Sequence, residues 1–103
     1  MKKEKMIPCV VCGRPTATRH HLIFGNGRRE ICEADKSAGV VVPLCDECHT
    51  LGKYRLHDNP VAEYLSKALG QALWEQWHVY KENKMITAEA RTEFVRRYGK
   101  GWL

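Results

Sequence analysis

Two pairs of closely spaced cysteines constrain this chain more than any other feature. The first pair lies in C-V-V-C-G and the second in C-D-E-C-H, with 32 residues between them; the four residues are Cys9, Cys12, Cys45 and Cys48. Two residues between cysteines let a tight turn aim both thiolates at one tetrahedral ion, and two such turns complete a four-sulfur site. A redox role is the alternative, but one pair alone would serve it. The spacing therefore predicts a structural zinc ion.

The chain is short and basic. Its 103 residues include 17 lysines and arginines against 12 aspartates and glutamates, and residues 1–55 hold ten of the basic residues but only six of the acids. A basic domain of this size commonly binds a polyanion, and nucleic acid is the first candidate, with simple solubility as the alternative. A chain this short builds a small core, which a bound metal would help to stabilise.

Nothing in the sequence is suited to a membrane or to secretion. No apolar run approaches the ~18 residues of a membrane span, and the charged start M-K-K-E-K-M-I lacks the apolar stretch of a secretory signal. We therefore expect a cytoplasmic protein, in which paired cysteines bind metal rather than form disulfides. The fifth cysteine, Cys32, is expected to be a small, partly buried thiol.

The order of turns and apolar runs predicts one domain of the α+β class with three parts. Residues 1–8 are expected to be a flexible lead-in. Residues 9–58 are rich in turn-forming glycine and proline and contain two candidate strands, at residues 18–24 and 39–44. Residues 59–103 are predicted to be helical and to pack on that core.

Two helices are predicted in the last part. Asn59 can cap the first helix, and Pro60 suits its first turn. Gly70 interrupts this helix at a cost of about 1 kcal/mol relative to alanine where exposed. An apolar face runs to about residue 81 and is expected to pack in the core; its members are Val61, Leu65, Leu69, Leu73, Trp77 and Tyr80.

The second helix is expected to begin with Thr87 as its N-cap and to stop at Gly99. The tail G-K-G-W-L is expected to fold Trp102 back onto the core. The side of the helix that faces the core is predicted to consist of Ala90, Phe94 and Tyr98.

Four of the five histidines lie between residues 20 and 57: His20, His21, His49 and His57. Neighbouring residues on a strand point to opposite faces, so His20 and His21 cannot share one environment. His49 directly follows the second cysteine pair, and a zinc ion there would hold it in place. For the adjacent pair, the structural alternative is one packed and one solvated histidine.

Four stretches together resemble the HNH nucleases, also called ββα-metal or His-Me finger nucleases: C-V-V-C-G, R-H-H-L-I, V-P-L-C-D-E-C-H and L-H-D-N-P. The resemblance covers about residues 9–58. It implies a zinc-stapled ββα-metal core, followed here by the C-terminal helices. The later W-E-Q-W and R-R-Y-G-K-G-W-L also resemble small HNH proteins of phages and prophages.

The resemblance implies a role for each histidine. His20 would bind a catalytic divalent ion (Mg²⁺, Mn²⁺, Ni²⁺ or Zn²⁺) and His21 would be the general base. His49 and His57 would be further ligands of that ion. Phosphodiester hydrolysis needs a water deprotonated near neutral pH, which suits an imidazole with a pKa of about 6.5.

The chemistry of phosphodiester hydrolysis gives the basic side chains their expected tasks. Arg19 would add positive charge beside the ion, where the reacting phosphate gathers negative charge. The side chains expected to contact phosphates are Arg28, Arg29, Lys53 and Arg55. For each of them, the alternative is a side chain that is simply solvated. The expected substrate is DNA, most simply double-stranded, and the chain would act as a monomer or a homodimer.

Two departures from the family pattern keep other functions open. Members usually carry an asparagine before the second strand; D-K-S-A-G-V-V-V-P-L-C has none, and Asn26 lies early. Many members place the last two histidines four residues apart on one helix, whereas His49 and His57 are eight apart and need a loop between them. Two alternatives remain. One is a zinc ribbon that binds nucleic acid without cutting it, and the other is an interaction protein that docks through its aromatic helix.

Overall fold

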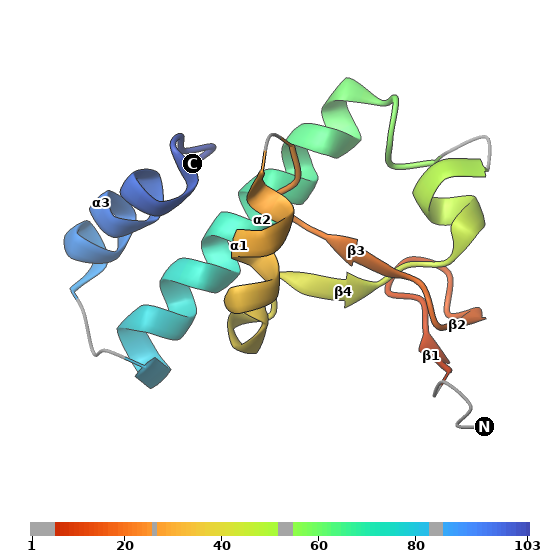
Figure 1. The fold of residues 1–103 in the computed structure, drawn as a ribbon, viewed down its shortest axis with the longest axis horizontal. Helices are drawn as coiled ribbons and strands as arrows, with labels where there is room; N and C mark the ends of the chain where they lie inside the picture. Colours follow the sequence, from red (N-terminus) through yellow and green to blue (C-terminus); the bar gives the residue numbers. More distant parts are fainter. Residues whose placement is uncertain (1–5, 26, 52–54, 83–85) are drawn as a thin grey trace.

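The computed structural model describes residues 6–25, 27–51, 55–82 and 86–103. The fold is α+β, as expected: it combines two small antiparallel sheets with a long helix, which passes one of the sheets, and several shorter helices (Figure 1). The strands are β1 (Ile7–Pro8), β2 (Pro15–Thr16), β3 (Arg19–His21) and β4 (Val41–Pro43). The helices are α1 (Arg28–Ala34), α2 (Pro60–Trp77) and α3 (Thr87–Tyr98), with a 3₁₀ turn, η1 (Lys36–Ala38), and two π-helical turns, η2 (Glu47–Leu51) and η3 (His78–Glu82).

The two predicted strands pair with each other, although each is shorter than expected. β3 and β4 are antiparallel, with His20 opposite Val42 and His21 opposite Val41. Backbone bonds continue the ladder at both ends, from Leu22 N to the Val40 carbonyl (2.8 Å) and from Leu44 N to the carbonyl of residue 18 (3.1 Å). This hairpin sets the directions in which the two adjacent histidines point.

The first cysteine pair sits at the tip of a second hairpin. β1 pairs with β2, so residues 7 and 8 belong to a strand rather than to the expected flexible lead-in. Cys9 N donates to the Arg14 carbonyl (2.9 Å) and Gly13 N donates to the Cys9 carbonyl (2.9 Å). Gly13 has a φ of 79°, the left-handed conformation that such a turn needs. Val10 N donates to the Pro43 carbonyl (3.0 Å), which joins this hairpin to β4.

Helix α1 was not predicted from the sequence. It follows Gly27, which takes a left-handed φ of 79° and offers no side-chain cap. Seven residues are too few to show a helical period or to be stable alone. The helix is held instead by the core, where Cys32 is fully buried rather than partly so, and its thiol donates to the Ile23 carbonyl (3.3 Å).

Helix α2 begins where predicted but buries a different face. Asn59 is its N-cap and accepts a hydrogen bond from Ala62 N (3.2 Å). The prediction that the apolar stripe packs in the core is wrong for its first part, since Val61, Leu65 and Leu69 are all more than half exposed, as is Tyr80. The buried positions of the helix are Ser66, Gly70, Gln71, Trp74 and Glu75.

Gly70 is therefore not a flaw but the point where α2 crosses the end of the β3 strand. A Cβ atom at this position would lie 2.6 Å from Cγ1 of Ile23 and 3.0 Å from Cβ of Leu22. Only a glycine allows the helix to approach the hairpin this closely.

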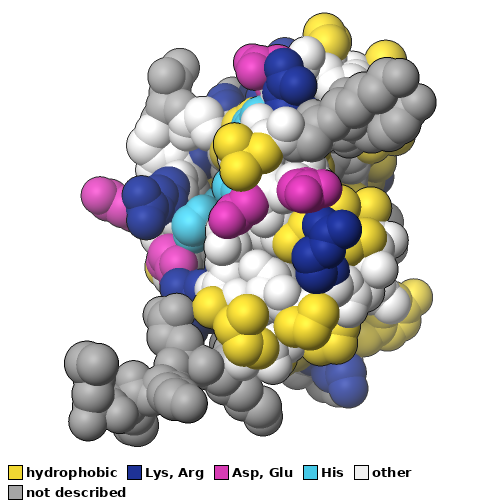
Figure 2. All heavy atoms as spheres, turned by 90° about the vertical axis from the view of Figure 1, so that its right-hand side faces the viewer, with side chains coloured by type: hydrophobic (Ala, Val, Ile, Leu, Met, Phe, Trp, Pro, Cys, Tyr) yellow, Lys and Arg dark blue, Asp and Glu magenta, His cyan; other side chains and the backbone are white. Residues whose placement is uncertain are grey.

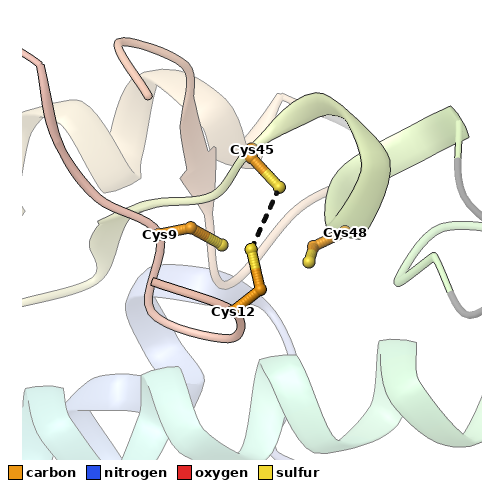
Figure 3. A group of neighbouring side chains, drawn as sticks. All are labelled: Cys9, Cys12, Cys45 and Cys48. Carbon is orange, nitrogen blue, oxygen red and sulfur yellow. Dashed lines mark hydrogen bonds between the residues drawn. The ribbon is translucent and has the colours of Figure 1, made fainter. Parts of the chain in front are cut away.

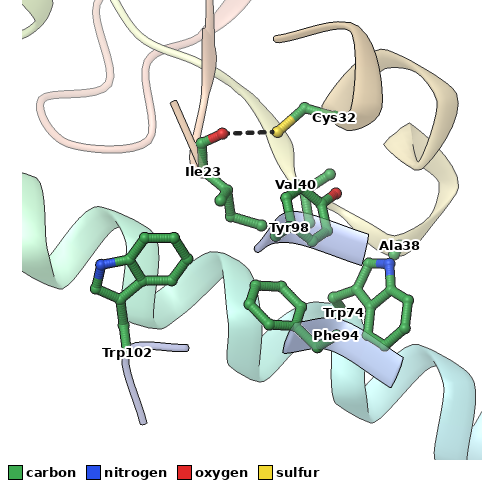
Figure 4. Packing of buried hydrophobic residues seen from close by; sticks show 8 residues of the cluster. All are labelled: Ile23, Cys32, Ala38, Val40, Trp74, Phe94, Tyr98 and Trp102. Carbon is green, nitrogen blue, oxygen red and sulfur yellow. Dashed lines mark hydrogen bonds between the residues drawn. The ribbon is translucent and has the colours of Figure 1, made fainter. Parts of the chain in front are cut away.

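Helix α3 and the tail complete the main core as predicted. α3 begins at Thr87, with Ile86 rather than Thr87 as the N-cap residue, and Gly99 ends it in a left-handed conformation. Trp102 folds back and is 8% exposed. The core cluster, drawn in Figure 4, consists of Ile23, Cys32, Ala38, Val40, Trp74, Phe94, Tyr98 and Trp102.

A carboxylate at the end of α1 ties the three helices together. Asp35 accepts hydrogen bonds from the Trp74 indole (3.0 Å), from the Tyr98 hydroxyl (2.8 Å) and from two nitrogens of Arg97 (2.6 and 2.8 Å). None of the helices in the described ranges is long and apolar enough to cross a bilayer.

Candidate metal centres

The four paired cysteines converge on one point (Figure 3): two lie on the β1–β2 hairpin, Cys45 lies just before η2, and Cys48 lies within it. All four sulfurs lie within 4.8 Å of one another, and Cys12 Sγ is 3.6 Å from Cys45 Sγ. Sulfurs at the corners of a tetrahedron around zinc lie about 3.8 Å apart, given Zn–S bonds of about 2.3 Å. The cluster could hold a zinc ion, as the spacing predicted.

Backbone and arginine N–H groups surround these sulfurs. Val11 N donates to Cys9 Sγ (3.4 Å), and Arg14 donates to Cys12 Sγ from its backbone N (3.4 Å) and to Cys45 Sγ from Nη1 (3.7 Å). Burial raises the pKa of the Cys9 thiol, but backbone hydrogen bonds, first that of Cys12, outweigh burial and lower the pKa to about 6. The thiolate is the form that binds zinc, and these hydrogen bonds favour it at Cys9, whereas burial raises the pKa of Cys48 to about 12.

A second cluster consists of three histidine rings. His20 Nδ1 lies 3.2 Å from His49 Nε2, and His57 Nε2 lies 2.9 Å from the same nitrogen. Ring nitrogens bound to one ion lie about 2.9 to 3.4 Å apart, given bonds of about 2.1 Å. The three residues come from β3, from η2 and from the loop before α2, so the fold has brought together side chains that are far apart in the sequence.

Hydrogen bonding within this cluster cannot satisfy all three rings. His49 Nε2 faces two other ring nitrogens, yet one nitrogen can donate only one hydrogen or accept through only one lone pair. A single cation at the centre would interact favourably with all three nitrogens. The arrangement therefore fits a metal site better than it fits a hydrogen-bonded histidine cluster.

The tautomer of His20 follows from its second contact. Ser66 Oγ lies 2.7 Å from the Leu22 carbonyl and must donate its only hydrogen there. His20 Nε2, 2.9 Å from the same oxygen, must then be the donor, and Nδ1 keeps its lone pair toward the cluster. A ligand histidine is commonly fixed in this way by a hydrogen bond at its other nitrogen. Burial, followed by the neighbouring His49 and His57, lowers the pKa of His20 to about 3.

A backbone connection returns His57 to the site. Leu56 N donates to the Cys48 carbonyl (2.8 Å) and His57 N donates to the His49 carbonyl (3.1 Å). The backbone of residues 56 and 57 therefore lies alongside η2. His57 is thus brought back beside His49, as a shared site requires; residues 52–54, and with them Lys53, lie outside the described residues. Asp58 then takes a φ of 69°, in the left-handed region, and turns the chain into α2.

His21 points away from the three-histidine cluster, as the alternation along a strand predicts. Its Nε2 lies 2.9 Å from Oε1 of Glu33, on α1, and Arg19 Nη2 lies 3.1 Å from the same oxygen. The hydrogen bond with His21 lowers the pKa of Glu33, and the charge of Arg19 lowers it further. Sequence reasoning missed Glu33, since only the unpredicted helix α1 places it beside β3.

One cavity of about 480 Å³ joins these groups. Its lining comprises Arg19, His20, His21, Phe24, Gly25, Gly27, Arg29, His49 and His57. Figure 2 shows histidine side chains at the surface of this side of the molecule, with basic and acidic side chains beside them. Both histidine environments thus open onto a shared space.

The predicted phosphate contacts do not all reach this cavity. Arg29 lines it and is exposed, whereas Arg28 lies beside the C-terminal segment and donates to the Tyr98 carbonyl (3.0 Å). Arg55 forms an ion pair with Asp58 (3.7 Å). Asn26, the nearest asparagine to the expected loop position, lies outside the described residues.

A somewhat larger cavity, of about 550 Å³, lies between α1, α2 and α3. Its ionisable groups already have partners: Asp35 binds Arg97, and Glu93 pairs with Arg96 (3.1 Å). None of the residues that line this larger cavity was predicted from the sequence as a catalytic or metal-binding residue.

Comparison with known proteins places the chain in a family. A search of curated proteins and a search of solved structures each gave no match. The model of one family matches residues 2–73, a range that holds both cysteine pairs and the four clustered or adjacent histidines. The chain therefore belongs to the family described as "Protein of unknown function (DUF968)".

Proposed function

We propose that this protein is a metal-dependent endonuclease that hydrolyses DNA phosphodiester bonds, built on the ββα-metal core of the HNH nucleases. One observation carries the proposal. Three imidazoles from separate elements meet around one point, and the histidine next to one of them reaches the same cavity from the other side of the strand. The β3–β4 hairpin followed by η2 supports the assignment to that core.

The three-histidine cluster is the proposed site of the catalytic ion, with His20, His49 and His57 as ligands. A divalent ion held there supplies positive charge for the oxygens that become negative during hydrolysis. The fixed tautomer of His20 keeps a lone pair directed at the cluster. Four thiolates 4.8 Å or less apart form the separate, structural zinc site and hold η2, and therefore His49, in register with β3.

His21 is the proposed general base. The carboxylate of Glu33 accepts a hydrogen bond from its Nε2, which leaves a lone pair on Nδ1 to take a proton from the attacking water. Glu33 fixes the ring through this bond, a task for which the family pattern would use the missing asparagine. Arg19 and Arg29 line the cavity and can bind the phosphate oxygens.

A zinc ribbon that binds nucleic acid without cutting it is the alternative function. It is favoured by the fact that Glu33 engages both His21 and Arg19, as a purely structural ion-pair network would. Its four-sulfur site would be the same, so only the histidines discriminate between the two functions.

Plasmid cleavage tests the proposal. The protein is expected to nick or linearise plasmid DNA in Mg²⁺, Mn²⁺ or Ni²⁺, and chelation is expected to stop it. His21→Ala should abolish cleavage while the melting temperature and the zinc content stay unchanged. His78→Ala is the matched control, because this histidine lies on η3, outside the cavity lining. Full cleavage by His21→Ala would overturn the assignment of the base, and no cleavage with any ion would favour the zinc ribbon.

A further inference from the structure

Three basic side chains surround the ring of Trp102. Arg28 Cζ lies 5.1 Å from the ring centroid, Lys67 Nζ 5.7 Å and Lys100 Nζ 6.0 Å. The three come from the start of α1, the middle of α2 and the segment after α3, so it is the fold that gathers them. We call these four residues the Trp102 patch.

The positive charges of this patch are not balanced within the described residues. In the part of the chain that the structure describes, no carboxylate forms an ion pair with Arg28, Lys67 or Lys100. Arg28 is instead bound to uncharged carbonyls, those of Tyr98 (3.0 Å) and Phe24 (3.4 Å). Like charges gathered around one ring repel one another, and a polyanion lying across them would relieve the repulsion.

The patch is rigid. Gln71 Oε1 accepts hydrogen bonds from the backbone N of Trp102 (2.6 Å) and of Leu103 (3.1 Å), and Gln71 itself is fully buried. The Tyr64 hydroxyl donates to the Trp102 carbonyl (2.6 Å). The backbone of Trp102 is thus fixed by these contacts, and Arg28 is held beside its ring by two carbonyl groups.

The patch borders the histidine cavity. Lys67 Nζ lies 4.6 Å from the ring centroid of Phe24 as well as near Trp102. The Phe24 ring in turn lies 4.6 Å from the His57 ring and 5.4 Å from the His20 ring, and Phe24 lines the cavity. A single aromatic ring therefore separates Lys67 from the proposed metal ligands.

We propose that the Trp102 patch binds the phosphate backbone of duplex DNA, at the segment of DNA that extends beyond the three-histidine cluster. Lys67 and Lys100 are the phosphate contacts. This inference rests on the proposed function, which is the reason for naming DNA as the ligand. It extends the DNA-binding surface beyond the cavity, into the C-terminal part of the chain. Lysine ammonium groups bind phosphate as point charges and need no fixed angle, which suits side chains packed on a ring.

The salt dependence of DNA binding tests this surface directly. A labelled duplex is titrated by fluorescence anisotropy over a range of salt concentrations, with protein purified without chelator and with no divalent ion added. The slope of log K against log salt has a magnitude of about 0.9 for each phosphate that the protein neutralises. Lys67→Gln and Lys100→Gln should each reduce this magnitude by about that amount, and the double variant by about twice as much.

Two sets of controls separate binding from packing. Lys81→Gln removes an exposed lysine from η3 and should leave the slope unchanged. Lys67→Arg and Lys100→Arg keep the charge and should keep the slope. If the double glutamine variant has an unchanged slope, or if the unaltered protein does not bind the duplex, the inference is wrong. Because Lys100 is exposed, its variant decides the matter even if the Lys67 variant unfolds.

The outcome does not depend on whether the protein cuts DNA. A protein that cleaves plasmid but shows the same slope in every variant would retain the proposed function and lose this inference. A protein that never cleaves, yet shows the reduced slopes, would lose the proposed function and retain the binding surface.

Discussion

Nε2 of His21 lies 2.9 Å from a carboxylate oxygen of Glu33, while the adjacent His20 faces the opposite side of β3 and contacts His49. Two neighbouring imidazoles therefore have different partners: one a carboxylate, the other a cluster of ring nitrogens. This division is what separate roles in proton transfer and metal binding require.

Glu33 is predicted to be a positioning residue for His21. Glu33→Ala should lower the rate of DNA cleavage about 100-fold, because a general base that is free to turn away loses its alignment. The turnover rate should fall while DNA affinity, measured by anisotropy, stays unchanged. Glu30→Ala, on an exposed position of the same helix, is the control and should cleave normally. Equal rates in the two variants would show that Glu33 serves only as an ion-pair partner.

The four-sulfur cluster is predicted to stabilise the fold through its metal. Cys45→Ser should unfold the chain or sharply lower its melting temperature, because the free energy of zinc binding is part of the folding free energy. Elemental analysis should find less than one zinc per chain. Cys32→Ser removes a buried thiol outside the cluster and should keep its zinc. A Cys45→Ser protein with full zinc content would contradict the assignment.

Gly70 tests the close packing of α2 against the hairpin. Helix propensity alone predicts that Gly70→Ala stabilises the protein by about 1 kcal/mol. The nearby atoms of Ile23 and Leu22 predict the reverse, a destabilisation of about 1 to 3 kcal/mol from overpacking. Ala72→Gly, on an exposed side of the same helix, measures the propensity effect alone. Denaturant unfolding of the two variants distinguishes the contributions, and a more stable Gly70→Ala protein would refute the close packing.

The stability of the protein without its second ion is predicted to fall in acid, in part because of His20. Its pKa is about 6.5 in an unfolded chain and about 3 in the folded one, so the unfolded chain binds the proton more readily. This contribution is fully present above pH 6.5 and is lost as the pH falls toward 3. His20→Gln should unfold with a smaller dependence on pH in that window. An identical dependence in both proteins would mean that His20 is not held neutral.

Local patterns predicted the residues of the cysteine cluster, and the family resemblance implied those of the histidine cluster, but neither predicted the surfaces around them. Both cysteine turns, the Asn59 cap and the end of α3 at Gly99 follow from short-range chemistry, and the structure places them as expected. The roles inferred for the histidines from the family resemblance remain predictions, although three of the four rings do meet.

Tertiary contacts account for the features that local patterns could not predict. On α2 the first part of the apolar stripe is exposed, whereas the buried face includes polar residues whose partners lie in other segments. Ser66 binds the Leu22 carbonyl, and Gln71 binds the backbone of Trp102. Such partners carry no local signature, and Glu33 was missed for the same reason.

The most direct test counts the ions bound to one chain. Protein purified without chelator is analysed for zinc and then titrated with Mn²⁺ or Ni²⁺ by calorimetry. We predict one firmly held zinc per chain and one further site, which His49→Ala abolishes while that zinc stays bound. Titrations that are the same for the unaltered protein and for His49→Ala would mean that the three rings share no cation.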